Sequence, residues 1–99
     1  MFGFVDAAGL MGVDDSIFKY RGAYKDNLND CIQNGSYKIN KVAYPETSNI
    51  PGSSVYGILV VFTTDYWHFQ IFSNLGTEVY LRTRSDNGVW GSWNKVEYA

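Results

Sequence analysis

Residues 56–62 read Tyr-Gly-Ile-Leu-Val-Val-Phe, residues 67–72 read Trp-His-Phe-Gln-Ile-Phe, and residues 78–84 read Glu-Val-Tyr-Leu-Arg-Thr-Arg. These runs are rich in β-branched and aromatic residues, which are typical of strands. The connections between them are short, as in turns between antiparallel neighbours. The sequence therefore predicts a mostly β fold, built as a small antiparallel meander sheet.

The chain continues with Asn-Gly-Val-Trp-Gly-Ser-Trp at residues 87–93. Asn-Gly is a strong hairpin signal, because both residues accept positive φ angles. A last short strand is expected over residues 89–96. Trp90 and Trp93 are three residues apart and cannot point the same way from a regular strand. We therefore expect one of them to close the core and the other to lie nearer the surface.

The N-terminal half predicts shorter elements. Residues 16–25 alternate aromatic with basic side chains, which indicates a first, partly exposed strand. Residues 26–32 predict one short helical turn, with Asp26 or Asn27 as its N-cap. Residues 36–42 alternate as a further strand, and residues 43–55 contain both prolines and predict a long surface loop.

The length of 99 residues limits the chain to one domain. Residues 1–15 have no clean period and are expected to form an irregular segment that contacts another chain, with simple disorder as the alternative. Residues 16–99 are expected to form a single β-rich knob domain.

Composition excludes several classes of function. The net charge of −2 argues against nucleic-acid binding, and no apolar run is long enough to cross a membrane. The N-terminus does not resemble a secretory signal peptide. Cys31 is the only cysteine, which excludes an internal disulfide and favours a small buried apolar role.

Alternation divides the side chains of the sheet between two faces. Residues 56–62 are apolar on both sides, which predicts a central strand. We expect the core to take this strand together with Trp67, Phe69, Ile71, Val79 and Leu81. The opposite face would bring together four polar or aromatic side chains by cross-strand pairing: His68, Gln70, Tyr80 and Arg82.

These four side chains are the candidate ligand-binding residues. Their ring faces and hydrogen-bond donors suit a sugar or an anionic glycan. Arg84, Trp90 and Asn87 are secondary candidates, and residues 45–54 would lie at the rim. The competing interpretation is an ordinary solvated sheet face.

No catalytic pattern accompanies these residues. His68 is the only histidine and has no nucleophile or carboxylate motif beside it. The glutamates lack the paired setting that glycoside hydrolysis needs. One histidine and one cysteine disfavour a metal site within one chain, although three chains could supply three His68 ligands. The sequence predicts a domain that is not an enzyme and needs no metal or cofactor.

Five short motifs follow one another in a fixed order. They are Asn-Gly-x-Tyr at 34–37, Pro-Gly at 51–52, Tyr-Gly-x-Leu-x-Val at 56–61, Tyr-x-Arg-Thr at 80–83 and Trp-x-x-Trp at 90–93. This order resembles the pyocin-knob type domain of phage and tailocin tail fibres, over about residues 24–97.

The resemblance implies a tail-fibre domain of a phage or of a prophage-derived tail particle, assembled in the host cytoplasm. Such fibres are typically homotrimers whose knobs lie toward the host, and many bind cell-surface polysaccharide or another receptor. The family brings no common catalytic residues. We therefore expect a receptor-binding knob. A structural spacer or trimerisation unit is the alternative, and a polysaccharide-degrading enzyme is a further one.

Overall fold

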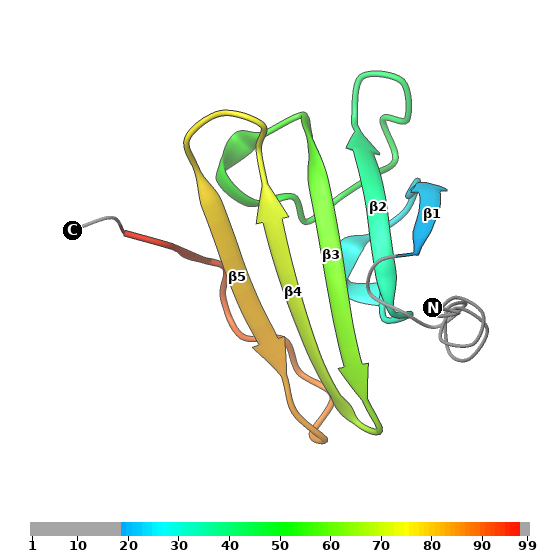
Figure 1. Cartoon of the computed structure of the whole chain (residues 1–99), viewed down its shortest axis with the longest axis vertical. Helices are drawn as coiled ribbons and strands as arrows, with labels where there is room; N and C mark the ends of the chain where they lie inside the picture. The colour runs from blue at the N-terminus through cyan, green and yellow to red at the C-terminus, as the bar shows by residue number, and fades with distance from the viewer. Residues whose placement is uncertain (1–18, 98–99) are drawn as a thin grey trace, which may run out of the picture.

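The computed structural model describes residues 19–97, whose strands form one sheet in chain order (Figure 1). The mostly β fold predicted from the sequence is confirmed. The irregular segment expected at residues 1–15 lies outside the described residues. The strands are β1 (Tyr20–Ala23), β2 (Gly35–Asn40), β3 (Tyr56–Thr64), β4 (Trp67–Ser73), β5 (Val79–Arg84) and β6 (Asn94–Lys95), and the 3₁₀ turns are η2 (Leu28–Asp30) and η3 (Pro51–Ser53).

Strands β2 to β6 pair antiparallel, as the predicted meander requires, while β1 pairs parallel with β2. A parallel pair cannot be joined by a tight turn. The chain between β1 and β2 therefore crosses one face of the sheet, and η2 forms within that crossing.

The helical turn expected at residues 26–32 is present as η2. The Asn27 side chain caps it by accepting a hydrogen bond from the backbone N–H of Asn29 at 2.9 Å. Leu28 and Cys31 are buried beneath it, whereas Ile32 is exposed. Burial raises the pKa of the Cys31 thiol to about 12, so this cysteine packs as a small apolar residue, as predicted.

The core lies between the sheet and the segments that connect its strands. Both 3₁₀ turns lie behind the strands in Figure 1, and η3 packs so closely on Tyr80 that a Cβ at Gly52 would collide with the tyrosine hydroxyl. The buried cluster draws one alternating set from the strands and two residues from the η2 region: Leu28, Cys31, Tyr37, Ile39, Leu59, Val61, Phe72 and Tyr80.

The predicted assignment of faces is wrong for β4 and β5. The face that carries His68, Gln70, Tyr80 and Arg82 is covered, and these side chains are 8%, 0%, 9% and 5% exposed. Trp67, expected in the core, is 65% exposed on the other face. The reason is that the cover consists of turns and loops, whose backbone carbonyls need buried donors. Gln70 donates to two such carbonyls on that side, and Arg82 pairs with the Gln70 side chain.

The opposite face carries the apolar side chains that the sequence assigned to the core. Tyr56, Ile58 and Trp67 are 47%, 46% and 65% exposed there. Cross-strand pairs such as Val60 with Ile71 continue the apolar surface toward the middle of the sheet. Within residues 19–97, the buried cluster and both 3₁₀ turns lie on the other side. We call this surface the open face.

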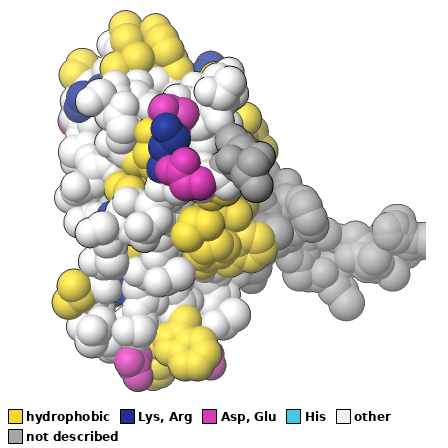
Figure 2. All heavy atoms as spheres, turned by 90° about the vertical axis from the view of Figure 1, so that its left-hand side faces the viewer, with side chains coloured by type: hydrophobic (Ala, Val, Ile, Leu, Met, Phe, Trp, Pro, Cys, Tyr) yellow, Lys and Arg dark blue, Asp and Glu magenta, His cyan; other side chains and the backbone are white. Residues whose placement is uncertain are grey.

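The last predicted strand is much shorter than expected. Residues 89–96 pair with β5 only at β6 and through a single bridge from Trp90 to Arg84. Figure 2 views the molecule from this side and shows hydrophobic groups around a basic side chain flanked by acidic ones. Lys95 lies on β6, and Glu78 directly precedes β5. Lys95 Nζ and Glu78 Oε2 form an ion pair at 3.2 Å. The Gly91 N–H still donates to the Thr83 carbonyl of β5, but residues 92–93 leave the sheet and can fold over the covered face.

Candidate ligand-binding pocket

An open pocket of about 630 Å³ lies where the chain after β5 passes over the covered face. Its volume is within the range of small-molecule sites. Residues from β5, from η2 and from the loop before η3 meet in it. They are joined by residues 88–93, which we call the closing segment. The lining residues are Asn29, Asp30, Asn49, Arg82, Arg84, Gly88, Val89, Trp90, Gly91, Ser92 and Trp93.

The turn after β5 starts the closing segment. The Gly88 N–H donates to the Ser85 carbonyl at 3.0 Å, and Gly88 has a φ of +78°, which glycine adopts without strain. The Asn87 side chain accepts from the Val89 N–H at 3.0 Å. The Asn87-Gly88 turn predicted from the sequence is therefore present, and Asn87 stabilises the turn.

Trp90 and Trp93 both fold over Arg82, contrary to the expectation that they point apart. The Arg82 Cζ atom lies 4.3 Å from the ring centroid of Trp90 and 4.4 Å from that of Trp93. The prediction assumed a regular strand, and residues 91–93 are not part of one. A guanidinium held against two indole faces gains cation–π attraction, which is strongest when water is excluded.

The indole N–H groups fix the two tryptophans to the loops beneath them. Trp90 Nε1 donates to the Asn29 carbonyl at 2.9 Å, and Trp93 Nε1 donates to the Asn49 carbonyl at 3.0 Å. Trp93 also contacts the buried Phe72 ring at a centroid distance of 6.4 Å. The closing segment is thereby tied to both covering loops, and the pocket walls are held in place.

Gln70 supports the floor of the pocket. Its Nε2 donates to the carbonyls of Leu28 at 2.8 Å and Cys31 at 2.9 Å, and its Oε1 accepts from Arg82 Nε at 2.8 Å. One buried amide thus orients the guanidinium and satisfies two carbonyls of the η2 turn. This network accounts for the polar residue at the centre of the covered face.

Residues that line the pocket carry buried, unpaired polar atoms. Within residues 19–97, three buried side-chain atoms lack a hydrogen-bond partner: Asn29 Oδ1, Arg82 Nη2 and Arg84 Nε. All three belong to residues that line this pocket. Buried polar groups are satisfied in the great majority of cases, so the grouping of three in one place indicates a site for a polar ligand.

The pocket carries positive charge. Burial lowers the pKa of Arg82 to about 10, which still leaves the guanidinium protonated at pH 7. Burial, and then the nearby charge of Arg84, lowers the pKa of His68 below its ordinary 6.5, so this ring is neutral at pH 7. Asp30 is the acidic residue of the lining. Two arginines against one aspartate give the pocket a formal charge of +1.

The structure separates the residues that the sequence grouped together. Arg82 lines the pocket, as do two of the secondary candidates, Arg84 and Trp90. Gln70 lies beneath Arg82. His68 packs beside Trp90 at a centroid distance of 6.2 Å. The expected exposed patch of four side chains is therefore wrong, and one of the four reaches the pocket.

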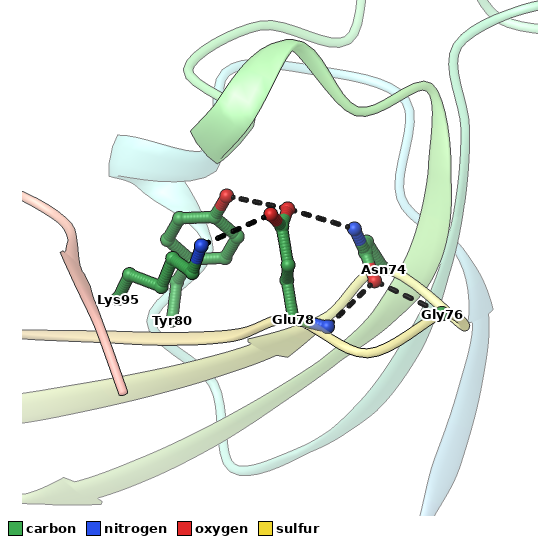
Figure 3. Close-up of polar contacts among 5 residues, drawn as sticks. All are labelled: Asn74, Gly76, Glu78, Tyr80 and Lys95. Atoms are coloured by element: carbon green, nitrogen blue, oxygen red, sulfur yellow. Dashed lines mark hydrogen bonds and ion pairs between the residues drawn. The ribbon is translucent and has the colours of Figure 1, made fainter. Parts of the chain in front are cut away.

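Tyr80 belongs to a different cluster. Its hydroxyl donates to Glu78 Oε1 at 2.8 Å, and the same carboxylate accepts from Asn74 Nδ2 at 3.1 Å and pairs with Lys95 (Figure 3). Asn74 Oδ1 in turn accepts from the N–H of Gly76 at 2.9 Å. Glu78 thus joins the turn between β4 and β5 to β6.

Glu78→Gln is expected to remove a pH-dependent part of the stability. The hydrogen bonds from Tyr80 and Lys95, and the Lys95 charge, lower the pKa of Glu78 below its ordinary 4.5. The stabilisation is therefore fully present above pH 4.5 and is lost as the pH falls through the folded-state pKa. Melting temperatures of the two proteins between pH 7 and pH 2 should converge at the acid end. A constant difference, or the same pattern for Glu46→Gln at an exposed loop position, would contradict this.

Asn29 and Trp93 were not among the residues predicted from the sequence to bind a ligand, whereas Asn49 belongs to the 45–54 segment that was expected at the rim. Asn49 has a φ of +63°, a conformation that asparagine tolerates better than most residues. The η2 turn is brought to β5 only by tertiary structure, so no local pattern could have placed Asn29 beside Arg82.

Within residues 19–97, no three side chains of the metal-binding types (His, Cys, Asp, Glu) come together. In the same part of the chain, no helix has the length and apolar character needed to span a bilayer. Comparison with known proteins adds nothing to these findings, since no family model, no curated protein and no solved structure matches the chain.

Proposed function

We propose that this chain is the receptor-binding knob of a tail-fibre protein from a phage or a prophage-derived tail particle, and that it attaches to a glycan on the bacterial surface. The observation that carries the proposal is the pocket over Arg82, with two indoles and three unpaired polar atoms in its lining. The ordered motifs that resemble pyocin-knob domains support the fibre context.

The pocket has the character of a sugar site. Ligand sites combine apolar ring surface with a few fixed polar groups that set orientation. Trp90 and Trp93 supply the ring surface, and Arg82, Arg84 and Asn29 supply donors and an acceptor. The proposal assigns binding and no catalysis. Several copies of the knob on one fibre would add their weak affinities through effective concentration.

Ser92→Trp is expected to abolish most glycan binding. Ser92 is exposed in the pocket lining, so a bulky side chain there fills the pocket without disturbing the core. The measurement is binding of the labelled protein to an array of bacterial capsular and lipopolysaccharide glycans. We expect the variant to lose at least about tenfold in affinity, or about 1.4 kcal/mol.

Thr77→Trp is the matched control. Thr77 is exposed in the turn between β4 and β5 and is not part of the lining, so the same substitution there should leave binding unchanged. Full binding by Ser92→Trp would show that the pocket is not the site. Failure of the unmodified protein to bind any arrayed glycan or whole bacterial cell would exclude the proposed function.

A second candidate function, assembly of like subunits, is favoured by the open face. A sheet surface on which Tyr56, Ile58 and Trp67 are each at least 46% exposed is typical of an interaction site. Two depressions, of about 350 and 420 Å³, lie beside these residues. The occupant we propose is a second copy of this chain, in the trimer that the resemblance implies.

Light scattering tests the second candidate. The unmodified chain should form an oligomer, and Ile58→Lys should shift it toward monomer because a lysine charge would be buried in the contact. Tyr66→Lys, at a turn residue that is 73% exposed and lies outside the strands, is the control and should leave the mass unchanged. A monomer at every concentration would exclude assembly through this face.

A further inference from the structure

The unpaired atoms of the pocket define the chemistry of its ligand, if the pocket binds a glycan as proposed above. Two of them, Arg82 Nη2 and Arg84 Nε, are donors on positively charged groups. The third, Asn29 Oδ1, is an acceptor. A complementary ligand must therefore present acceptors, preferably anionic, on one side and a donor on another.

Arg82 has no anionic partner within the described part of the chain. The ion pair found among residues 19–97 is that of Lys95 with Glu78, and Arg82 Nε pairs with the neutral amide of Gln70. The Arg82 side chain is only 5% exposed. A buried cation without a counter-charge is unfavourable, and a carboxylate that approached it would form strong, charge-assisted hydrogen bonds.

Asp30 limits how much negative charge the pocket can accept. With two arginines and one aspartate in the lining, the formal charge of +1 matches a monoanion better than a dianion. The aspartate and Asn29 can also accept hydrogen bonds from hydroxyl groups. The flat indole surfaces suit a ring rather than a small free anion.

We propose that the pocket selects an acidic sugar, in which a carboxylate is held by Arg82 and Arg84 and ring hydroxyls are held by Asn29 and Asp30. The ligand class is thus a carboxylate-bearing residue, such as a uronic acid, within a bacterial surface polysaccharide. Neutral sugars would leave both arginine donors unpaired and would bind more weakly.

The test uses NMR signals of the pocket itself. The indole N–H groups of Trp90 and Trp93 and the Arg82 Nε–H are all hydrogen-bonded. Their signals should shift when methyl β-glucuronide is added to the full chain. Methyl β-glucoside has a CH₂OH group in place of the carboxylate. Its affinity should be at least about tenfold lower, as expected when a charge-assisted contact is lost.

Two variants at one position test the charge. Ser92→Glu places a negative charge in the lining and should weaken glucuronide binding about tenfold, whereas the matched, neutral Ser92→Gln should leave binding within about twofold. If Ser92→Glu bound the glucuronide as well as Ser92→Gln does, or if the two sugars had equal affinity for the unmodified chain, the acidic class would be overturned.

Free anions are the remaining arms of the experiment. Sodium acetate or inorganic phosphate that shifted the same signals with the affinity of glucuronide would show a simple anion site and overturn the sugar assignment. Absence of any shift at tens of millimolar glucuronide would overturn it as well. These outcomes are separate from the glycan array, because array binding to neutral glycans alone would retain the proposed function and exclude only the acidic ligand.

Discussion

Gln70→Leu should lower the free energy of unfolding by about 3–5 kcal/mol, close to the whole stability of a small domain. Leucine fills a similar volume but has no polar atoms. It would leave the buried Arg82 guanidinium without its Nε partner and the Cys31 carbonyl without the Gln70 donor, while the Leu28 carbonyl would keep the N–H of Cys31. Unpaired buried groups carry most of the expected loss, because their desolvation is no longer compensated.

Urea denaturation followed by tryptophan fluorescence measures this loss. The double variant Gln70→Leu with Arg82→Met should recover part of the stability, since no buried charge remains. Gln33→Leu, the same substitution at an exposed position, should stay within about 0.5 kcal/mol of the unmodified protein. A loss below about 1 kcal/mol for Gln70→Leu would show that water satisfies the network instead.

Gly57→Ala should destabilise the sheet by about 3 kcal/mol, at the upper end of overpacking effects. A Cβ at Gly57 would collide with the ring of Phe72 and with the backbone oxygen of Ser73, both on β4. Phe72 is fully buried. The ring has little room to move, and a shift of the Ser73 backbone would disturb the pairing of β3 with β4.

Gly91→Ala is the matched control for this second substitution. A Cβ there would lie 3.6 Å from the Thr83 oxygen, which is ordinary contact. Its unfolding free energy should remain within about 0.5 kcal/mol of the unmodified protein. If Gly57→Ala were equally mild by the same urea measurement, the close packing of β3 on β4 at Phe72 would be wrong.

The strands could be predicted because their signal is local. Alternation and β-branched residues place β3, β4 and β5 to within a few residues, and Asn87-Gly88 fixes the turn that follows. The parallel pairing of β1 could not be predicted in the same way. It depends on where the crossing through η2 leads the chain, which no short-range pattern encodes.

The choice of face could not be predicted from hydrophobicity. On β4, the set Trp67, Phe69 and Ile71 is more apolar than His68, Gln70 and Phe72, yet the second set is covered. The cover is made of loops, whose backbone carbonyls need hydrogen-bond donors. These carbonyls favour contact with a face that carries donor side chains. That reason appears only when η2 and Gln70 are brought together across 42 residues of sequence.

The pocket was predicted in part. Arg82, Arg84 and Trp90 are close in sequence to the hairpin that builds the site, so they were among the candidates. Asn29 comes from the distant η2 turn and was not predicted, whereas Asn49 lies in the loop that was expected at the rim. Trp93 was set aside because a regular strand would turn it away from Trp90. Residues 92–93 leave the pairing with β5, and this departure lets both indoles line one pocket.

The reversal of the two faces has a consequence for handling the domain in solution. In the described part of the chain, Gln70 and Arg82 are buried. Trp67, Tyr56 and Ile58 are exposed to solvent. A gain in folding stability therefore does not bring a gain in colloidal stability, because the exposed apolar side chains that favour precipitation belong to the folded state. Added sulfate, which strengthens the burial of apolar surface, should raise the free energy of unfolding and also promote aggregation.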